Sequence, residues 1–348
     1  MIREFGYEYD ASLQKNLWNT TEGQFTDEKL LGAYCLRSGR DALKAIAREI
    51  TPCTVYLPAL SCDSMFQPFE QYGHQVCFYE LNEDYSVRLD HLRPKEQRAF
   101  FLYLDYFGQP AISDTVLKAL RTEHPNLIFI EDRTHNLLWE RKSDFQPDYT
   151  VASLRKWLAV PDGGLLWGRI QKPLNEDASF YTTRLKAQCM RHEFLQNGDE
   201  SIKTEYRKIF STVSDLMDHD EPCKMSAYSY NLASNADWST IKAMRKKNAE
   251  TLSSILSSCG HIKLIENAGG LYVPFFIQNR DEIQRRLSAM GIFNTIIWPL
   301  TEKQKEACSV ARRTVDHMLA APCDQRYTEE DMAYIGKEII RVVCEVNG

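Results

Sequence analysis

Short apolar segments alternate with amphipathic helical segments through the first half of this chain, and this order restricts the possible folds more than any other feature. Continuous apolar strands separated by amphipathic helices are typical of a parallel sheet that helices cover on both faces. We therefore predict an α/β fold with a mostly parallel sheet. The strand-like segments are residues 54–57, 75–81, 100–104 and 127–130, and the clearest helical ones are residues 40–50 and 113–123.

The pattern changes after about Leu174, where long charged helical segments begin. They are followed by an apolar segment at residues 270–277, a further helical segment, and a last helix after Tyr327. A chain of 348 residues with 43% hydrophobic composition can bury two moderate cores. We predict a large domain over residues 1–220 and a smaller α+β domain over residues 221–348.

Composition argues against several classes of partner. The chain has 42 basic and 48 acidic residues and no basic stripe, so we do not expect it to bind nucleic acid. Residues 1–6 lack the apolar run of a signal peptide, and no later apolar run is long enough to span a bilayer. We expect a cytoplasmic protein without a membrane partner. Its ten cysteines show no metal-ligand spacing, which predicts reduced packing residues and no metal.

Two strand ends carry candidate functional side chains. The strand at 127–130 runs into Glu131 and Asp132, at the sheet edge where doubly wound folds bind ligands, and Asp132 is the stronger candidate. By itself, such an aspartate is more often a turn former or helix cap. Lys156 follows the strand-like residues 149–152. A lysine at such an edge can lose contact with water and act as a nucleophilic amine, although most lysines are solvated surface charges.

A third candidate is the turn Ser38-Gly39-Arg40 at the start of the first predicted helix. A helix start presents backbone N–H groups and a positive dipole end, which suit a phosphate, and Arg40 adds charge. An ordinary helix cap is the alternative interpretation.

In this order, the motifs resemble those of the DegT/StrS family of pyridoxal-phosphate (PLP) dependent sugar aminotransferases, which have the aspartate-aminotransferase fold, fold type I. The resemblance covers nearly the whole chain. It is carried by Ser38–Leu43, Pro58–Ser61, Phe107–Pro110, Ile130–Asp132, Ser153–Lys156 and Gly163–Gly164, and in the last third by Arg245–Ala249, Asn279–Glu282, Ala321–Pro322 and Thr328–Asp331.

The resemblance implies a role for each candidate. Lys156 would hold PLP through a Schiff base and move a proton between the substrate α-carbon and the cofactor. Asp132 would pair with the pyridine nitrogen and keep it protonated. Ser153, together with Gly39 and Arg40, would bind the phosphate.

The sequence departs from the family pattern around the predicted cofactor. His135 stands where the family usually has a glutamine near the phenolic oxygen, and its protonation would make the cofactor sensitive to pH. Cys62 stands where an aromatic ring usually covers the cofactor, so Met65 or Tyr106 is the alternative cover. The segment that reaches the neighbouring subunit is not clear around residues 225–231. For Arg155, we favour a structural ion pair.

The leading hypothesis is therefore a homodimeric aminotransferase that moves an amino group from an amino acid such as glutamate to a nucleotide-linked keto-sugar. A PLP-dependent lyase or dehydratase of the same family is an alternative, although such relatives tend to replace the lysine with histidine. A non-catalytic relative that acts as a binding or regulatory protein is another alternative. A nicotinamide-dependent enzyme is disfavoured because no G-x-G-x-x-G follows the first strand.

Overall fold

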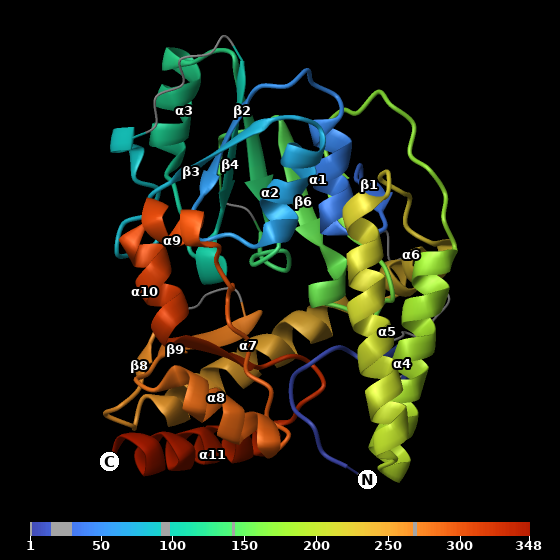
Figure 1. Ribbon diagram of the computed structural model, residues 1–348, viewed down its shortest axis with the longest axis vertical. Coiled ribbons are helices and arrows are strands. Elements are labelled where there is room, and N and C mark those ends of the chain that lie inside the picture. The colour runs from blue at the N-terminus through green and yellow to red at the C-terminus, as the bar shows by residue number, and fades with distance from the viewer. Residues whose placement is uncertain (1, 15–29, 92–97, 141–142, 267–269) are drawn as a thin grey trace.

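The computed structural model describes residues 2–14, 30–91, 98–140, 143–266 and 270–348. In this part of the chain, the larger sheet has seven strands in the order β1-β7-β6-β5-β4-β2-β3 (Figure 1). Strands β2 to β6 pair in parallel, and β7 is antiparallel to both β6 and β1. The predicted α/β class with a mostly parallel sheet is confirmed. The strands are β1 (Tyr34–Leu36), β2 (Thr54–Pro58), β3 (Gln75–Tyr79), β4 (Ala99–Leu104), β5 (Leu127–Asp132), β6 (Tyr149–Ser153) and β7 (Gly164–Trp167).

The central strands are apolar because side chains on both of their faces are buried. All six residues of β4 are buried, as expected for a strand covered on both faces. The helices predicted at residues 40–50 and 113–123 are present as α1 (Gly39–Ala47) and α3 (Asp114–Glu123), and α2 (Asp63–Gln71) lies between them in the sequence. Helix α1 buries one apolar face that includes Ala42, Leu43 and Ile46.

The charged segments after Leu174 form two long antiparallel helices, α4 (Ser179–Asn197) and α5 (Glu200–His219), along one side of the molecule (Figure 1). Gly198 allows the sharp reversal between them because it has a left-handed backbone, with φ of 76°. The side chain of Asp199 then caps α5 by accepting the N–H of Ser201.

The C-terminal part contains a smaller antiparallel sheet in the order β10-β9-β8, whose apolar core includes Phe5 from the N-terminal segment. The domain boundary near residue 221 remains a prediction. None of the helices in the described ranges is long and apolar enough to cross a membrane. The elements are α6 (Ala227–Ser234), α7 (Trp238–Leu256), β8 (Lys263–Leu264), β9 (Tyr272–Phe276), α8 (Arg280–Ala289), α9 (Glu302–Ala307), α10 (Ser309–His317), β10 (Met318–Pro322) and α11 (Glu329–Asn347).

Candidate active site

The N-terminus of α1 is held rigidly by a buried polar cluster. The Ser38 side chain accepts the N–H of Asp41 at 3.0 Å and donates its own proton to the Asp41 carboxylate at 2.8 Å. Arg37 pairs with the same carboxylate, with its Nε 2.9 Å from Oδ2, and both side chains are almost completely buried. The first-turn N–H groups at Gly39 and Arg40 have no partner within a helix, so this end can receive an anion.

Glycine is required where β7 passes this helix start. A Cβ atom on Gly164 would lie 2.1 Å from the carbonyl carbon of Ser38 and 2.5 Å from the nitrogen of Gly39. On the other side, a Cβ on Gly39 would lie 3.4 Å from the Cβ of Ser153, so the two residues are in contact distance. The Gly-Gly motif therefore brings the start of α1 against the end of β6, and it places Gly39 beside Ser153.

Thr134 links the two strand ends that carry the predicted catalytic residues. Its N–H donates to Oδ1 of Asp132 at 2.8 Å, and its hydroxyl accepts the N–H of Ser153 at 3.1 Å. Its carbonyl oxygen accepts the indole N–H of Trp157 at 2.8 Å. This role could not be predicted from the sequence, because threonine after a strand is an ordinary turn residue.

Asp132 and Lys156 face the same space. Lys156 lies at the end of a short 3-10 helix, Leu154–Lys156, which directly follows β6. Burial raises the pKa of Asp132, and the hydrogen bonds from Thr134 and the positive charge of Lys156 counteract this effect. Lys156 also interacts electrostatically with His135 and Cys62.

His135 is held in one neutral form. The backbone N–H of Phe107 donates to Nδ1 of His135 at 3.3 Å, so in the neutral ring the proton is on Nε2, which can donate. Burial, with a smaller contribution from the nearby Lys156 cation, lowers the pKa of His135 to about 3. The ring is therefore neutral near pH 7, and the expectation that its protonation makes the site sensitive to pH is wrong.

The predicted residues surround one cavity of about 160 Å³. All six predicted site residues line it: Gly39, Arg40, Asp132, His135, Ser153 and Lys156. Cys62 and Met65 also contribute to the wall. Tyr106, the other suggested cover, is buried elsewhere and donates its hydroxyl proton to the carbonyl oxygen of Leu60.

Trp298 supplies an aromatic wall that the sequence did not indicate. Its ring centroid lies 5.3 Å from that of His135 and 5.8 Å from Nζ of Lys156. The residue belongs to the segment after α8, more than 140 positions from Lys156. No local pattern marks such a residue, because its position depends on how the C-terminal part packs against the large sheet.

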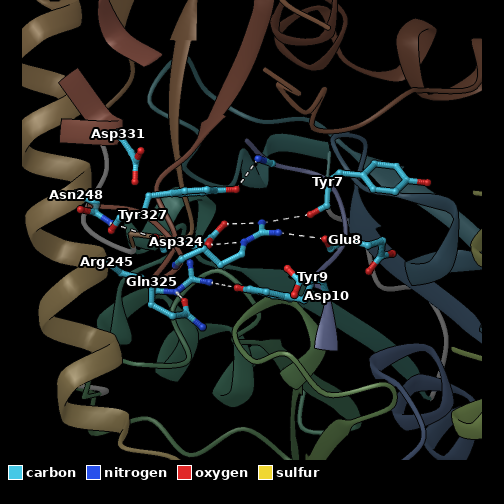
Figure 2. A network of polar contacts seen from close by, with 12 residues as sticks. Tyr7, Glu8, Tyr9, Asp10, Arg245, Asn248, Asp324, Gln325, Tyr327 and Asp331 are labelled. Atoms are coloured by element: carbon cyan, nitrogen blue, oxygen red, sulfur yellow. Dashed lines mark hydrogen bonds and ion pairs between the residues drawn. The ribbon is translucent and has the colours of Figure 1, made fainter. Parts of the chain in front are cut away.

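A second cavity of about 390 Å³ adjoins the first and shares Ser153, Arg155 and Lys156 with it. Its other walls come from the N-terminal segment and from the C-terminal part, whose polar groups face one another in Figure 2. Arg155 makes no ion pair with any of the described residues, and its buried Nε has no hydrogen-bond partner among them. The structural ion pair predicted for Arg155 is therefore wrong.

The strand order and the cavity at the ends of β5 and β6 define an α/β protein with the fold type I architecture. No protein-family model matches the sequence, and no curated protein matches it. Solved structures do match, and they include aminotransferases. The chain has their fold, as the sequence resemblance predicted.

Three of these structures illustrate the similarity. PseC from Helicobacter pylori, an aminotransferase involved in the biosynthesis of pseudoaminic acid, has a TM-score of 0.66 at 13% identity over 99% of this chain and 100% of its own. A DegT DnrJ EryC1 StrS aminotransferase from Brucella abortus has a TM-score of 0.63 at 16% identity, covering 89% of this chain and 86% of its own. NtdA from Bacillus subtilis, with bound cofactor PMP, has a TM-score of 0.63 at 14% identity, covering 93% and 78%.

Proposed function

We propose that this protein is a PLP-dependent aminotransferase that uses the 160 Å³ cavity as its cofactor site. The observation that carries the proposal is the meeting of three groups from separate elements. These groups are the carboxylate of Asp132, the amine of Lys156 and the N-terminus of α1 beside Ser153. The bound PMP of NtdA supports the same cofactor for a chain of this fold.

The residues present fit the cofactor. The phosphate would bind the first-turn N–H groups of α1 with Ser153 and Arg40, because a helix start favours an anion. Burial raises the pKa of Asp132 because it destabilises the charged carboxylate. A protonated pyridine nitrogen is a cation that would pair with this carboxylate and stabilise it. His135 would direct its Nε2 proton toward an oxygen acceptor, and Trp298 would help to exclude water.

PLP supplies an electron sink for the pair left behind when a proton leaves the substrate α-carbon. In this chain, Lys156 would take that proton and return it, a role supported by its position in the shared wall of the two cavities. The adjoining 390 Å³ cavity is the space for substrates.

The finer parts of the proposal rest on the resemblance and on the neighbours' names. We propose glutamate or a similar amino acid as amino donor and a nucleotide-linked keto-sugar as acceptor, with a homodimer as the working assembly in the cytoplasm. PseC and its role in pseudoaminic acid biosynthesis support a sugar acceptor.

The test is reductive trapping. Protein purified with PLP should show a visible absorbance band, and borohydride should fix the cofactor to Lys156 in a peptide map. Lys156→Gln should abolish the trapped adduct, whereas Lys186→Gln, a change at an exposed lysine on α4, should leave it intact. A colourless protein, or an adduct on another lysine, would contradict the proposal.

A further inference from the structure

Most charged side chains of the second cavity are bonded to other protein groups, several of which are drawn in Figure 2. Arg326 pairs with Asp324 through its Nε at 2.8 Å, and its Nη1 donates to the backbone carbonyl of Glu8 at 3.0 Å. Arg245 donates to the side chain of Gln325 at 2.7 Å and to the hydroxyl of Tyr9. These two arginines hold the N-terminal segment against the C-terminal part, and they have little capacity left for a ligand.

Arg155 is the exception among the arginines of this cavity. The two carboxylates that act on it electrostatically are Glu8 and Asp162, and both are bound elsewhere. Glu8 pairs with Arg184 at 2.7 Å, and Asp162 accepts hydrogen bonds from Ser226 and Ser229.

The surroundings of Arg155 favour an incoming anion. Its guanidinium is destabilised by burial and by the cations of Arg184 and Arg40, which lower its pKa to about 10. The Cζ atom of Arg155 lies 5.8 Å from the ring centroid of Phe180, which cannot accept an ion pair as a carboxylate would. A guanidinium remains charged at neutral pH and carries five donors in a fixed fork that matches a carboxylate. The buried Nε of this fork has no acceptor, which is costly, and a bound anion would remove that cost.

We propose that Arg155 binds a carboxylate of the amino donor at the junction of the two cavities. This inference rests on the proposed function and adds the residue that recognises the donor. Arg155 and Lys156 are consecutive on a 3-10 helix and line both cavities. A donor whose carboxylate binds Arg155 therefore has its amino group near Lys156.

The cofactor phosphate is the other anion that this arginine can reach, because Arg155 also lines the first cavity. Under the proposed function, that phosphate would bind the start of α1, Arg40 and Ser153. In the second cavity, by contrast, Arg155 is the one arginine among the described residues whose fork is not used by the protein. We therefore assign Arg155 to the donor carboxylate and not to the phosphate.

The experiment measures binding of glutarate, a dicarboxylate without an amino group, by titration calorimetry on the protein as purified with PLP. Arg155→Gln should weaken glutarate binding about tenfold to a hundredfold, because it removes a charge-assisted hydrogen-bond pair. Arg155→Lys should recover part of the affinity. The cofactor content of Arg155→Gln, measured from visible absorbance per chain, should equal that of the wild type. Arg312→Gln, at an exposed arginine on α10, is the matched control.

Each other result overturns the inference. Glutarate that does not bind the wild-type protein, or that binds Arg155→Gln equally well, removes the carboxylate site. Lower PLP content in Arg155→Gln with unchanged glutarate affinity assigns the arginine to the cofactor phosphate instead. If the chain binds no PLP at all, the proposed function fails, yet the glutarate titration still reports on Arg155. The two failures are thus distinguishable. Melting temperatures of the Gln and Lys variants equal to that of the wild type exclude misfolding as the cause.

Discussion

Replacing Gly164 with alanine tests the packing on which the whole candidate site depends. The new Cβ would lie 2.1 Å from the carbonyl carbon of Ser38, 2.2 Å from its oxygen and 2.5 Å from the nitrogen of Gly39. All three are backbone atoms and cannot rotate away. Gly164 is also paired on both sides, with Leu36 of β1 and Ser153 of β6. The protein must therefore move either these strand pairings or the start of α1.

The expected cost is large for a single methyl group. Overpacking usually costs 1–3 kcal/mol and more when backbone must shift, so we expect a loss of about 3 kcal/mol in the free energy of unfolding. With a urea m-value of about 3 kcal/mol/M, the unfolding midpoint should fall by about 1 M. PLP uptake should weaken as well, since the N–H groups at Gly39 and Arg40 would be displaced.

The assay is urea unfolding followed by circular dichroism, together with PLP titration by absorbance. Gly260→Ala is the matched control because its Cβ would meet no atom within 4 Å, and it should change stability by less than about 0.5 kcal/mol. If Gly164→Ala unfolded at the same urea concentration as Gly260→Ala and took up PLP normally, the close approach of β7 to α1 would be refuted.

Two further predictions follow from buried titratable groups. Because burial raises the folded-state pKa of Asp132, the stability associated with this carboxyl is fully present below its unfolded value, near pH 4, and is lost as pH rises through the folded pKa. Asp132→Asn should therefore raise the melting temperature of the cofactor-free protein at pH 7 but not near pH 4, and it should weaken PLP binding. If the variant and the wild type melted at the same temperature at pH 7, a buried charge on Asp132 would be contradicted. For His135, whose pKa burial lowers to about 3, histidine NMR should show a neutral ring with the proton on Nε2 from pH 5 to 8, and a titration in that range would contradict the assignment.

Much of the large sheet could be predicted from the sequence because its signals are local. The apolar segments at residues 54–57, 75–81, 100–104 and 127–130 are strands β2 to β5, with ends shifted by at most two residues. Since parallel strands end at one edge, the same reasoning brought Asp132 and Lys156 to a shared cavity. The short strands β1 and β7 were not predicted, because three or four residues carry little periodicity.

The rest of the site depends on contacts between distant parts of the chain. Trp298 reaches the cavity only through the packing of the C-terminal part, and no spacing in the sequence records that contact. The charge state of His135 depends on its burial and on the N–H of Phe107. The ion pair predicted for Arg155 does not form because its neighbouring carboxylates, Glu8 and Asp162, bind other groups.

The same long-range contacts determine where the amine of Lys156 lies. Arg245 on α7 donates through Nη2 to the carbonyl oxygen of Lys156 at 3.2 Å, and its guanidinium lies 4.7 Å from the ring centroid of Trp157. Gln325 donates to the carbonyl oxygen of Trp157 at 2.7 Å. The backbone that carries the lysine is therefore bonded to the C-terminal part as well as to β6. Because the peptide is fixed from both sides, a shift of the C-terminal part must move the lysine or break these hydrogen bonds. The position of the amine is thus a property of the packing between the two sheets, and the edge of the large sheet does not set it alone.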